Sequence, residues 1–281
     1  MITSSIRDDQ SADTEHLPVA RQSNQATPII SVLLLVGLWL TGLVGWRGLF
    51  SPSTNSVTES PVIGTARSSD PVQLAMAFVP NDGQFPEDVT FQARAMGGKL
   101  SFTAQKVYFD LPQGEVGLQF EGANSNVIIA GGELLRDVVN FYDSKDPDQW
   151  RENIPTYSQI LYAQLYPGID LLYEGDESRL KGAFRVEAGA DPNQIAWLYS
   201  GARDIEIDSK SGDLRIQLSD GRWTAAKWLI ERAPVAWQDN PSGRIPVEAA
   251  YAISKGGMIH FHFGMYDPAL PLIIDPLVLA P

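Results

Sequence analysis

One stretch of eighteen consecutive uncharged residues, 29–46, constrains this chain more than any other feature. Its sequence, IISVLLLVGLWLTGLVGW, is dominated by Leu, Val, Ile and Trp. A helix rises about 1.5 Å per residue, so this stretch reaches roughly 27 Å, close to the hydrocarbon thickness of a bilayer. A soluble helix that is apolar on all sides needs a large core around it, and the neighbouring residues are polar. The stretch therefore predicts a single transmembrane helix, which we place at residues 29–50.

This helix divides the chain into a polar tail (1–28), the helix itself (29–50), a Ser/Thr/Pro-rich linker (51–72) and a C-terminal domain (73–278). A cleaved signal peptide is disfavoured, because the polar leader is long and the apolar run exceeds the usual length of about 7–15 residues. Basic residues lie on both sides of the span, so the positive-inside rule barely discriminates. The linker is typical of a flexible spacer, and we expect a single-pass membrane protein whose large C-terminal domain is extracytoplasmic.

Small residues recur every four positions within the predicted span, at Gly37, Thr41 and Gly45. This face could pack closely against a second helix. The other interpretation is that small residues are simply frequent in membrane spans. In either case we expect membrane lipid to contact residues 29–50.

Composition excludes several classes of function. The net charge is −13, with 34 acidic and 21 basic residues, and nucleic-acid binding needs a basic face. The chain contains no cysteine, which excludes disulfides, Cys-ligated zinc and thiol chemistry. We therefore expect no nucleic-acid partner, and no motif predicts a cofactor.

Beyond the linker, apolar residues alternate with polar ones, which is typical of strands with one buried face. Residues 204–208, for example, read DIEID. Segments containing Gly or Pro separate such runs and predict tight turns; they include residues 96–99, 111–114, 209–212, 240–243 and 255–257. The pattern predicts a mainly β fold of antiparallel, sandwich-like layers. Asp-Pro pairs predict short helical turns within residues 146–152 and 191–195.

The polar loop at residues 143–153 is a candidate boundary within this domain. One interpretation places two β subdomains on either side of the loop, at residues 73–145 and 154–278. The other is a single continuous sandwich.

An ordered series of short motifs runs through the β region. They are Val79-Pro80-Asn81-Asp82-Gly83-Gln84, Asp146-Pro147, Trp150-Arg151, Pro155-Thr156-Tyr157, Tyr166-Pro167-Gly168-Ile169-Asp170, Gly189-Ala190-Asp191-Pro192 and Ile274-Asp275-Pro276. With this series, residues 76–278 resemble an uncharacterised domain of bacterial surface proteins that usually precedes SBBP-type repeats, which are predicted seven-bladed β-propeller repeats. No such repeats follow here, so the resemblance implies a stand-alone copy on its own membrane anchor. It implies a fold and a cell-envelope setting, but no activity.

Two histidines could serve as metal ligands. His260 and His262 are two residues apart, so they project from the same face of one predicted strand. A transition metal would need a third ligand, such as Asp267 or Asp275. Polar residues on a solvated strand face are the simpler interpretation, and we predict no metal site.

Four carboxylates, Asp170, Glu174, Asp176 and Glu177, cluster around Tyr173. Paired carboxylates can hydrolyse glycosides, and clustered carboxylate oxygens can bind calcium. The third interpretation is a solvated loop at the end of a strand. Sequence proximity alone shows neither the separation nor the raised pKa that catalysis needs, and we predict no catalytic residues.

The central motifs supply the candidate partner-binding residues. Trp150 and Arg151 stand in a polar loop, where Arg151 could stack on a ring or pair with Asp170. The alternative is that Trp150 anchors the loop beside a buried ion pair. The full candidate set is Trp150, Arg151, Tyr157, Tyr166, Pro167, Gly168 and Asp170.

The sequence therefore predicts a membrane-anchored, extracytoplasmic β module that is non-enzymatic and that binds or scaffolds an unidentified envelope protein or glycan. A hydrolase of envelope polysaccharide is the alternative, which a deep cleft with paired carboxylates would favour. A purely structural assembly domain is the third interpretation, and it predicts an exposed strand edge suited to pairing.

Overall fold

The alternation seen in the sequence becomes strand pairing in the C-terminal domain. The computed structural model of the chain describes residues 76–176, 179–218 and 228–279. All strand pairs in these residues are antiparallel. Two short 3-10 turns, η2 (Pro147–Gln149) and η3 (Pro192–Gln194), each follow a capping Asp and begin with Pro, which confirms both predicted helical turns.

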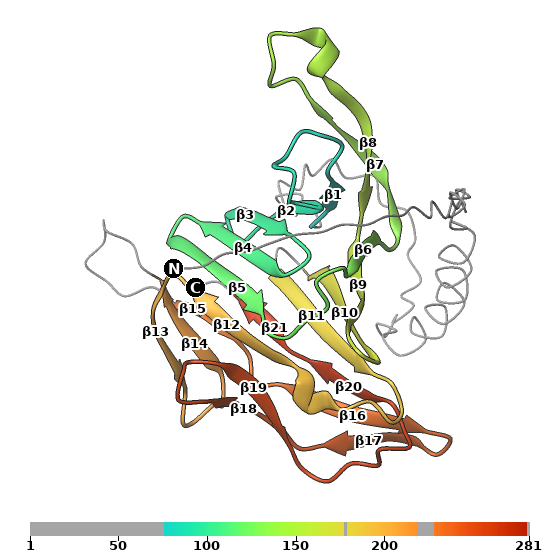
Figure 1. Cartoon of the computed structure of the whole chain (residues 1–281), viewed down its shortest axis with the longest axis vertical. Helices are drawn as coiled ribbons and strands as arrows, with labels where there is room; N and C mark the ends of the chain where they lie inside the picture. The colour runs from blue at the N-terminus through green and yellow to red at the C-terminus, as the bar shows by residue number, and fades with distance from the viewer. Residues whose placement is uncertain (1–75, 177–178, 219–227, 280–281) are drawn as a thin grey trace, which may run out of the picture. The chain divides into compact units, whose positions relative to one another are not determined.

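The first sheet, sheet A, contains ten strands in the described part of the chain (Figure 1). Its strands, in spatial order, are β18 (Ala249–Ile253), β19 (Ile259–Phe263), β12 (Ala196–Ser200), β5 (Gly114–Phe120), β4 (Lys106–Leu111), β3 (Gly98–Phe102), β2 (Phe91–Ala95), β1 (Phe78–Pro80), β8 (Arg151–Tyr157) and β7 (Leu134–Phe141).

The second sheet, sheet B, contains eleven strands in the same residues. Its main path is β13 (Ala202–Ile207), β14 (Leu214–Leu218), β15 (Trp228–Glu231), β21 (Leu277–Leu279), β11 (Arg179–Val186), β10 (Ile169–Asp176), β9 (Gln159–Tyr166) and β6 (Ile128–Gly131). A branch leaves β11 through β20 (Leu272–Asp275), β16 (Val235–Asn240) and β17 (Gly243–Val247).

The two sheets share one apolar core. Aromatic rings from one sheet contact rings from the other: Phe102 of β3 lies 5.5 Å from Tyr173 of β10, and Phe120 of β5 lies 5.8 Å from Tyr162 of β9. The hydroxyl of Tyr162 also donates to the carbonyl of Thr103 across the core (3.1 Å). The predicted mainly β, antiparallel fold is confirmed, and its two layers pack against each other.

The polar loop at residues 143–153 joins two neighbouring strands, β7 and β8, and so forms the end of a hairpin. Each sheet contains strands from both sides of this loop. In sheet A, β5 pairs with β12, and in sheet B, β6 pairs with β9. The described residues belong to one compact unit, so the sheets do not divide at this loop.

Several predictions concern residues outside the described part. The tail (1–28), the transmembrane helix (29–50) with Gly37, Thr41 and Gly45, and the linker (51–72) all lie there, and they stay predictions. Among the residues that the structure does describe, no helix has the length and apolar character needed to cross a bilayer.

Candidate partner-binding surface

The hairpin of β7 and β8, residues 134–157, projects from the body of sheet A (Figure 1), and we call it the arm. In the described residues, β8 pairs with β1 at a single position, Tyr157 opposite Phe78. β7 is an edge strand whose pairing with β8 is interrupted by two register shifts. Such irregularities twist an edge and hinder the addition of another strand. The arm therefore presents side chains rather than a regular backbone edge.

The loop between β1 and β2 is organised by one side chain, Asn81. Its Nδ2 donates to the carbonyls of Pro86 (2.9 Å) and Val89 (2.8 Å). Its Oδ1 accepts hydrogen bonds from the N–H groups of Gly83 (3.0 Å) and Phe85 (3.1 Å). These hydrogen bonds of the Asn81 side chain fix the loop, which contains the motif at residues 79–84.

This loop supports the arm through two contacts. The ring of Phe85 meets that of Phe141 edge to face at 5.5 Å, and the Nε of Arg151 donates to the carbonyl of Asp82 (2.6 Å). Gly83 has a φ of 93°, which glycine tolerates, and a Cβ at this position would lie 3.2 Å from the guanidinium. Two motifs that are 69 residues apart therefore meet and brace the arm.

Local contacts hold the end of the arm. The indole Nε1 of Trp150 donates to the carbonyl of Ser144 (2.8 Å), and the Trp150 ring meets that of Tyr142 edge to face at 5.2 Å. A hydrogen bond to Glu152 raises the pKa of Tyr142. Trp150 thus anchors the loop, as one interpretation of the sequence predicts, while its ring stays accessible.

Exposed apolar side chains concentrate on the arm. The described residues include ten large apolar side chains that are exposed, and four of these lie between residues 134 and 157. Leu134, Val138, Tyr142 and Trp150 are between 40% and 67% exposed. Concentrated apolar exposure of this kind marks interaction sites on soluble domains, so the arm is the candidate partner-binding surface.

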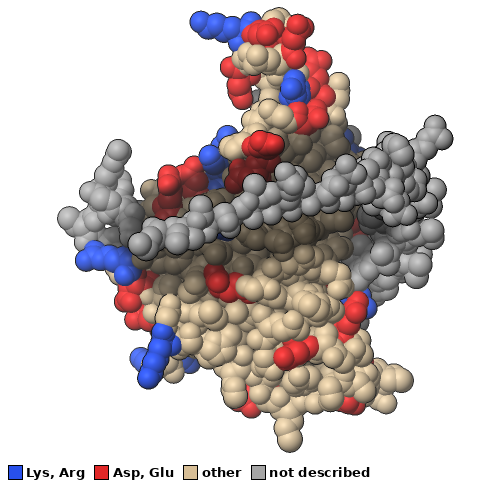
Figure 2. Space-filling view, viewed as in Figure 1, with Lys and Arg blue, Asp and Glu red and all other residues tan. Residues whose placement is uncertain are grey.

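The arm is also acidic. Five exposed carboxylates lie within residues 134–157, against three basic side chains. Figure 2 shows acidic side chains gathered at its end. The acidic residues are Asp137, Asp143, Asp146, Asp148 and Glu152. An apolar surface with an acidic surround selects a partner with the opposite charge.

The remaining predicted site residues lie away from the end of the arm. Tyr157, at the base of β8, is half-buried and meets Phe91 edge to face at 6.0 Å. Tyr166 is buried, and its hydroxyl donates to the carbonyl of Ala196 (2.8 Å). Pro167 and Gly168 form the turn between β9 and β10. These contacts are internal to the fold.

Asp170 also supports the fold from within. Its Oδ1 accepts a hydrogen bond from the N–H of Gln164 (2.6 Å), a residue held at a φ of 54°. Burial of Asp170 raises the pKa of its carboxyl. Arg151 does not pair with Asp170, because its guanidinium donates to the main-chain carbonyls of Asp82 and Trp150. The pairing of Arg151 with Asp170, one of the predicted alternatives, is therefore wrong.

The two histidines of β19 lie next to small residues. His260 is paired in register with Ala252 and Ala196, and His262 with Ala250. No group of three His, Asp or Glu residues that could hold a metal ion occurs in the part of the chain described by the structure. In the acidic cluster at residues 170–177, Glu177 falls outside that part.

A buried carboxyl that the sequence analysis missed joins the two sheets. Glu231 of β15, in sheet B, is 3% exposed and accepts a hydrogen bond from the hydroxyl of Tyr199 of β12, in sheet A. Tyr251 of β18 faces the same carboxyl. Burial raises the pKa of Glu231 to about 7. The sequence did indicate this position: Glu231 lies two residues after Leu229, and in a strand such residues point to the same face, here the inward one.

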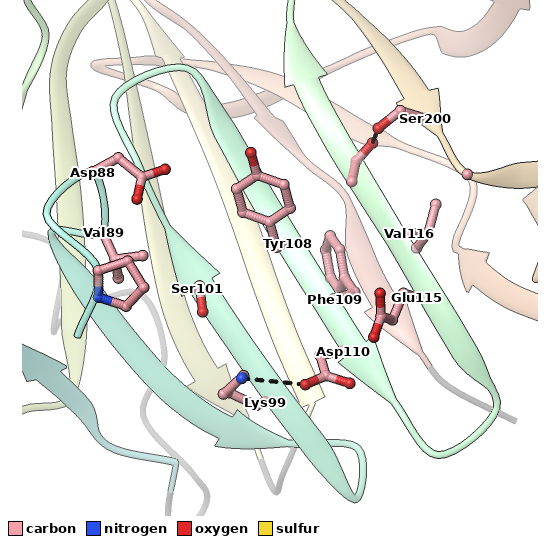
Figure 3. A pocket seen from close by; sticks show the side chains of 13 residues that line it. Asp88, Val89, Lys99, Ser101, Tyr108, Phe109, Asp110, Glu115, Val116 and Ser200 are labelled. Carbon is pink, nitrogen blue, oxygen red and sulfur yellow. Dashed lines mark hydrogen bonds and ion pairs between the residues drawn. The ribbon is translucent and has the colours of Figure 1, made fainter.

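The outer face of sheet A also has an open groove, centred on Tyr108 of β4 (Figure 3). Its residues come from four strands and one loop that are far apart in the chain. No local motif marks it.

A family model described as a domain of unknown function, DUF7948, matches residues 78–277, nearly the same residues as the motif series. No curated protein and no solved structure matches the chain.

Proposed function

The chain belongs to the DUF7948 family, a domain of unknown function, and we propose that it is a non-enzymatic module that binds a protein partner through the arm. The observation that carries this proposal is the exposure of Leu134, Val138, Tyr142 and Trp150 on one braced projection. Trp and Tyr dominate the binding energy of protein interfaces. A ring that is already held in place loses little conformational entropy when it is buried by a partner.

The charges around these side chains define the partner. Desolvating the exposed carboxylates of the arm is unfavourable unless opposite charges meet them. The matching surface is an apolar pocket that receives Trp150, with Lys and Arg residues at its rim. Complementary charges of this kind accelerate association and make it sensitive to salt.

The proposal also includes the location of the domain in the cell. The uncharged stretch at residues 29–46 supports a membrane anchor, and the linker supports a tethered domain on the extracytoplasmic side. The arm would then bind another protein of the cell envelope, and membrane lipid would contact residues 29–50.

The positions of the carboxyl groups favour binding over hydrolysis of a polysaccharide. A glycosidase needs two carboxyls about 5–10 Å apart at a cleft, one of them with a raised pKa. Among the described residues, Glu231 has the most strongly raised carboxyl pKa, and it lies in the core. The carboxylates of the arm are exposed, and so are Asp88, Asp110 and Glu115 of the groove on sheet A.

Site-specific crosslinking in producing cells tests the proposal. A photo-crosslinking amino acid replaces Val138 of the arm in the full chain, and replaces Ile245 of β17, also exposed, as the control. We expect a discrete adduct from position 138 alone. Trp150→Ala, or salt at about 0.5 M, should remove this adduct, whereas Tyr108→Ala should not. Equal adducts from both positions, or an adduct that survives Trp150→Ala, would refute binding through the arm.

A further inference from the structure

A row of side chains crosses the outer face of sheet A from β3 to β12. In register, Ser101 lies opposite Tyr108, Tyr108 opposite Gly117, and Gly117 opposite Ser200. An open groove of about 530 Å³ follows this row (Figure 3). Its volume is within the range of about 300–1,000 Å³ that is typical of ligand pockets.

Gly117 keeps the middle of the groove open. A Cβ at this position would lie 2.8 Å from the Oγ of Ser200 and 3.5 Å from the Cδ1 of Tyr108. Because Gly117 has no side chain, the ring of Tyr108 lies beside it, is 40% exposed, and is seen face-on in Figure 3. The groove therefore has a flat aromatic floor.

Hydrogen-bonding groups surround this ring. Ser101 is buried, and its Oγ accepts from the Nε2 of Gln92 (3.0 Å), which leaves its O–H available to donate into the groove. The carboxylate of Asp88 faces the groove from the loop before β2 (Figure 3). The groove thus combines one apolar aromatic ring with hydrogen-bonding groups around it.

A second row, of charged residues, runs beside the first. Lys99 lies opposite Asp110, and Asp110 opposite Glu115. The Nζ of Lys99 is 3.2 Å from Oδ2 of Asp110. Like charges directly opposite each other destabilise a sheet, so the Asp110 and Glu115 pair costs stability. Such local conflicts are expected at functional sites.

The charged groups that line the groove limit the class of ligand that it can bind. Three carboxylates and one ammonium line the groove, so an anionic ligand would be repelled. The open shape and polar walls do not suit a purely apolar ligand. A sugar ring fits both the Tyr108 ring and the polar groups around it. Its C–H groups carry slight positive charge toward the negative face of an aromatic ring, and its hydroxyls can both donate hydrogen bonds to those polar groups and accept hydrogen bonds from them.

We propose that this groove binds a neutral or amino-bearing saccharide, with one sugar ring on Tyr108 and its hydroxyl groups bonded to Asp110, Glu115 and Ser101. This site is separate from the arm and takes a different class of ligand. A chain with both sites would hold a glycan on the face of sheet A and a protein at the arm.

The test uses the full chain and a panel of immobilised oligosaccharides that are neutral, amino-bearing or anionic, with a Lys-rich peptide beside them. We expect binding to neutral or amino-bearing members and none to anionic ones. Tyr108→Ala should weaken binding to the best member about tenfold or more. Tyr108→Phe keeps the ring and should retain binding, and Tyr142→Ala on the arm is the matched control, which should leave it unchanged.

Three results would overturn the proposal: no binding to any oligosaccharide, preference for anionic members, or binding that survives Tyr108→Ala. Binding to the peptide alone would also overturn it, in favour of a groove for basic peptides. The crosslink from position 138 of the arm reports on the arm separately. Loss of one signal while the other persists therefore shows which of the two sites fails.

Discussion

The protonation of Glu231 makes the packing of the two sheets depend on pH. Its carboxyl lies in the core between Tyr199 and Tyr251, and burial raises its pKa from 4.5 to about 7. The folded state therefore holds a proton that the unfolded state releases between about pH 4.5 and 7. The contribution of the protonated Glu231 carboxyl to the unfolding free energy is fully present below about pH 4.5. It decreases as the pH rises to about 7 and is lost above that, because the carboxyl ionises more readily in the unfolded chain.

The first prediction is that Glu231→Gln flattens this pH dependence. The Gln amide keeps an acceptor for the Tyr199 hydroxyl and never ionises. We expect the unfolding free energy of the wild type, relative to the variant, to fall by about 3 kcal/mol between pH 4.5 and 8. Urea denaturation at a series of pH values measures both slopes. Parallel slopes in the two proteins would contradict the role of Glu231.

A second prediction concerns Asp170, which we interpret as a structural residue and not a partner contact. Asp170→Ala removes the acceptor for the N–H of Gln164 in a buried site, and we expect a loss of about 1–3 kcal/mol. Asp170→Asn keeps an acceptor oxygen and should cost less than Asp170→Ala. Thermal or urea unfolding measures both variants. Wild-type stability in Asp170→Ala would count against the structural interpretation.

At the scale of elements, the arm depends on the loop between β1 and β2. Arg151→Ala removes the hydrogen bonds to the carbonyls of Asp82 and Trp150, and each such bond contributes about 1 kcal/mol. The third prediction is faster amide exchange within residues 134–157 of this variant, with little change in the strands of sheet B. Hydrogen-exchange mass spectrometry of the full chain measures both regions.

The control for this prediction is Arg136→Ala, which removes an exposed cation from the same arm. It should leave the exchange rates near those of the wild type. If Arg151→Ala raised exchange equally across both sheets, Arg151 would support the whole fold and not the arm in particular.

Local patterns in the sequence predicted many individual elements. The Asp-Pro pairs predicted η2 and η3, because an Asp cap and a Pro at the first position act within one turn. Alternation predicted strands such as β13 and β14. Pairings such as β5 with β12 could not be predicted, since they join strands about 80 residues apart and depend on how the two sheets stack.

Local patterns also predicted part of the candidate site. Trp150 and Arg151 stood out as large side chains in a polar loop, and the structure places both at the end of the arm. The support of the arm, from Asp82 to Arg151 and from Phe85 to Phe141, consists of long-range contacts that no local pattern encodes. The groove around Tyr108 needs the register of four strands, so its residues carry no signal in the sequence.

At the scale of the whole molecule, the shared core predicts a single unfolding transition for the described domain. Both sheets contain strands from before and after residues 143–153, so neither half can keep its core alone. Phe102 is fully buried between Phe78 and Tyr173. Phe102→Ala should destabilise the domain by about 3–5 kcal/mol and lower one calorimetric transition without splitting it.

The matched control for this fourth prediction is Tyr108→Ala, in the neighbouring strand but on the outer face, which should change stability little. Two separable transitions, with only one of them shifted by Phe102→Ala, would indicate that the halves on either side of residues 143–153 fold separately.

Strand β1 is three residues long, and it is the element that connects the arm to the rest of sheet A. Of the described strands it lies nearest along the chain to the predicted anchor at residues 29–50, so tension from such an anchor would reach β1 before the other described strands. Three residues of ladder resist such a pull weakly compared with the longer strands beside them. Because Phe78 is fully buried in the core, a domain tethered at its N-terminus would under load lose the support of its arm together with this part of its core, and binding of a partner to the arm would become sensitive to force.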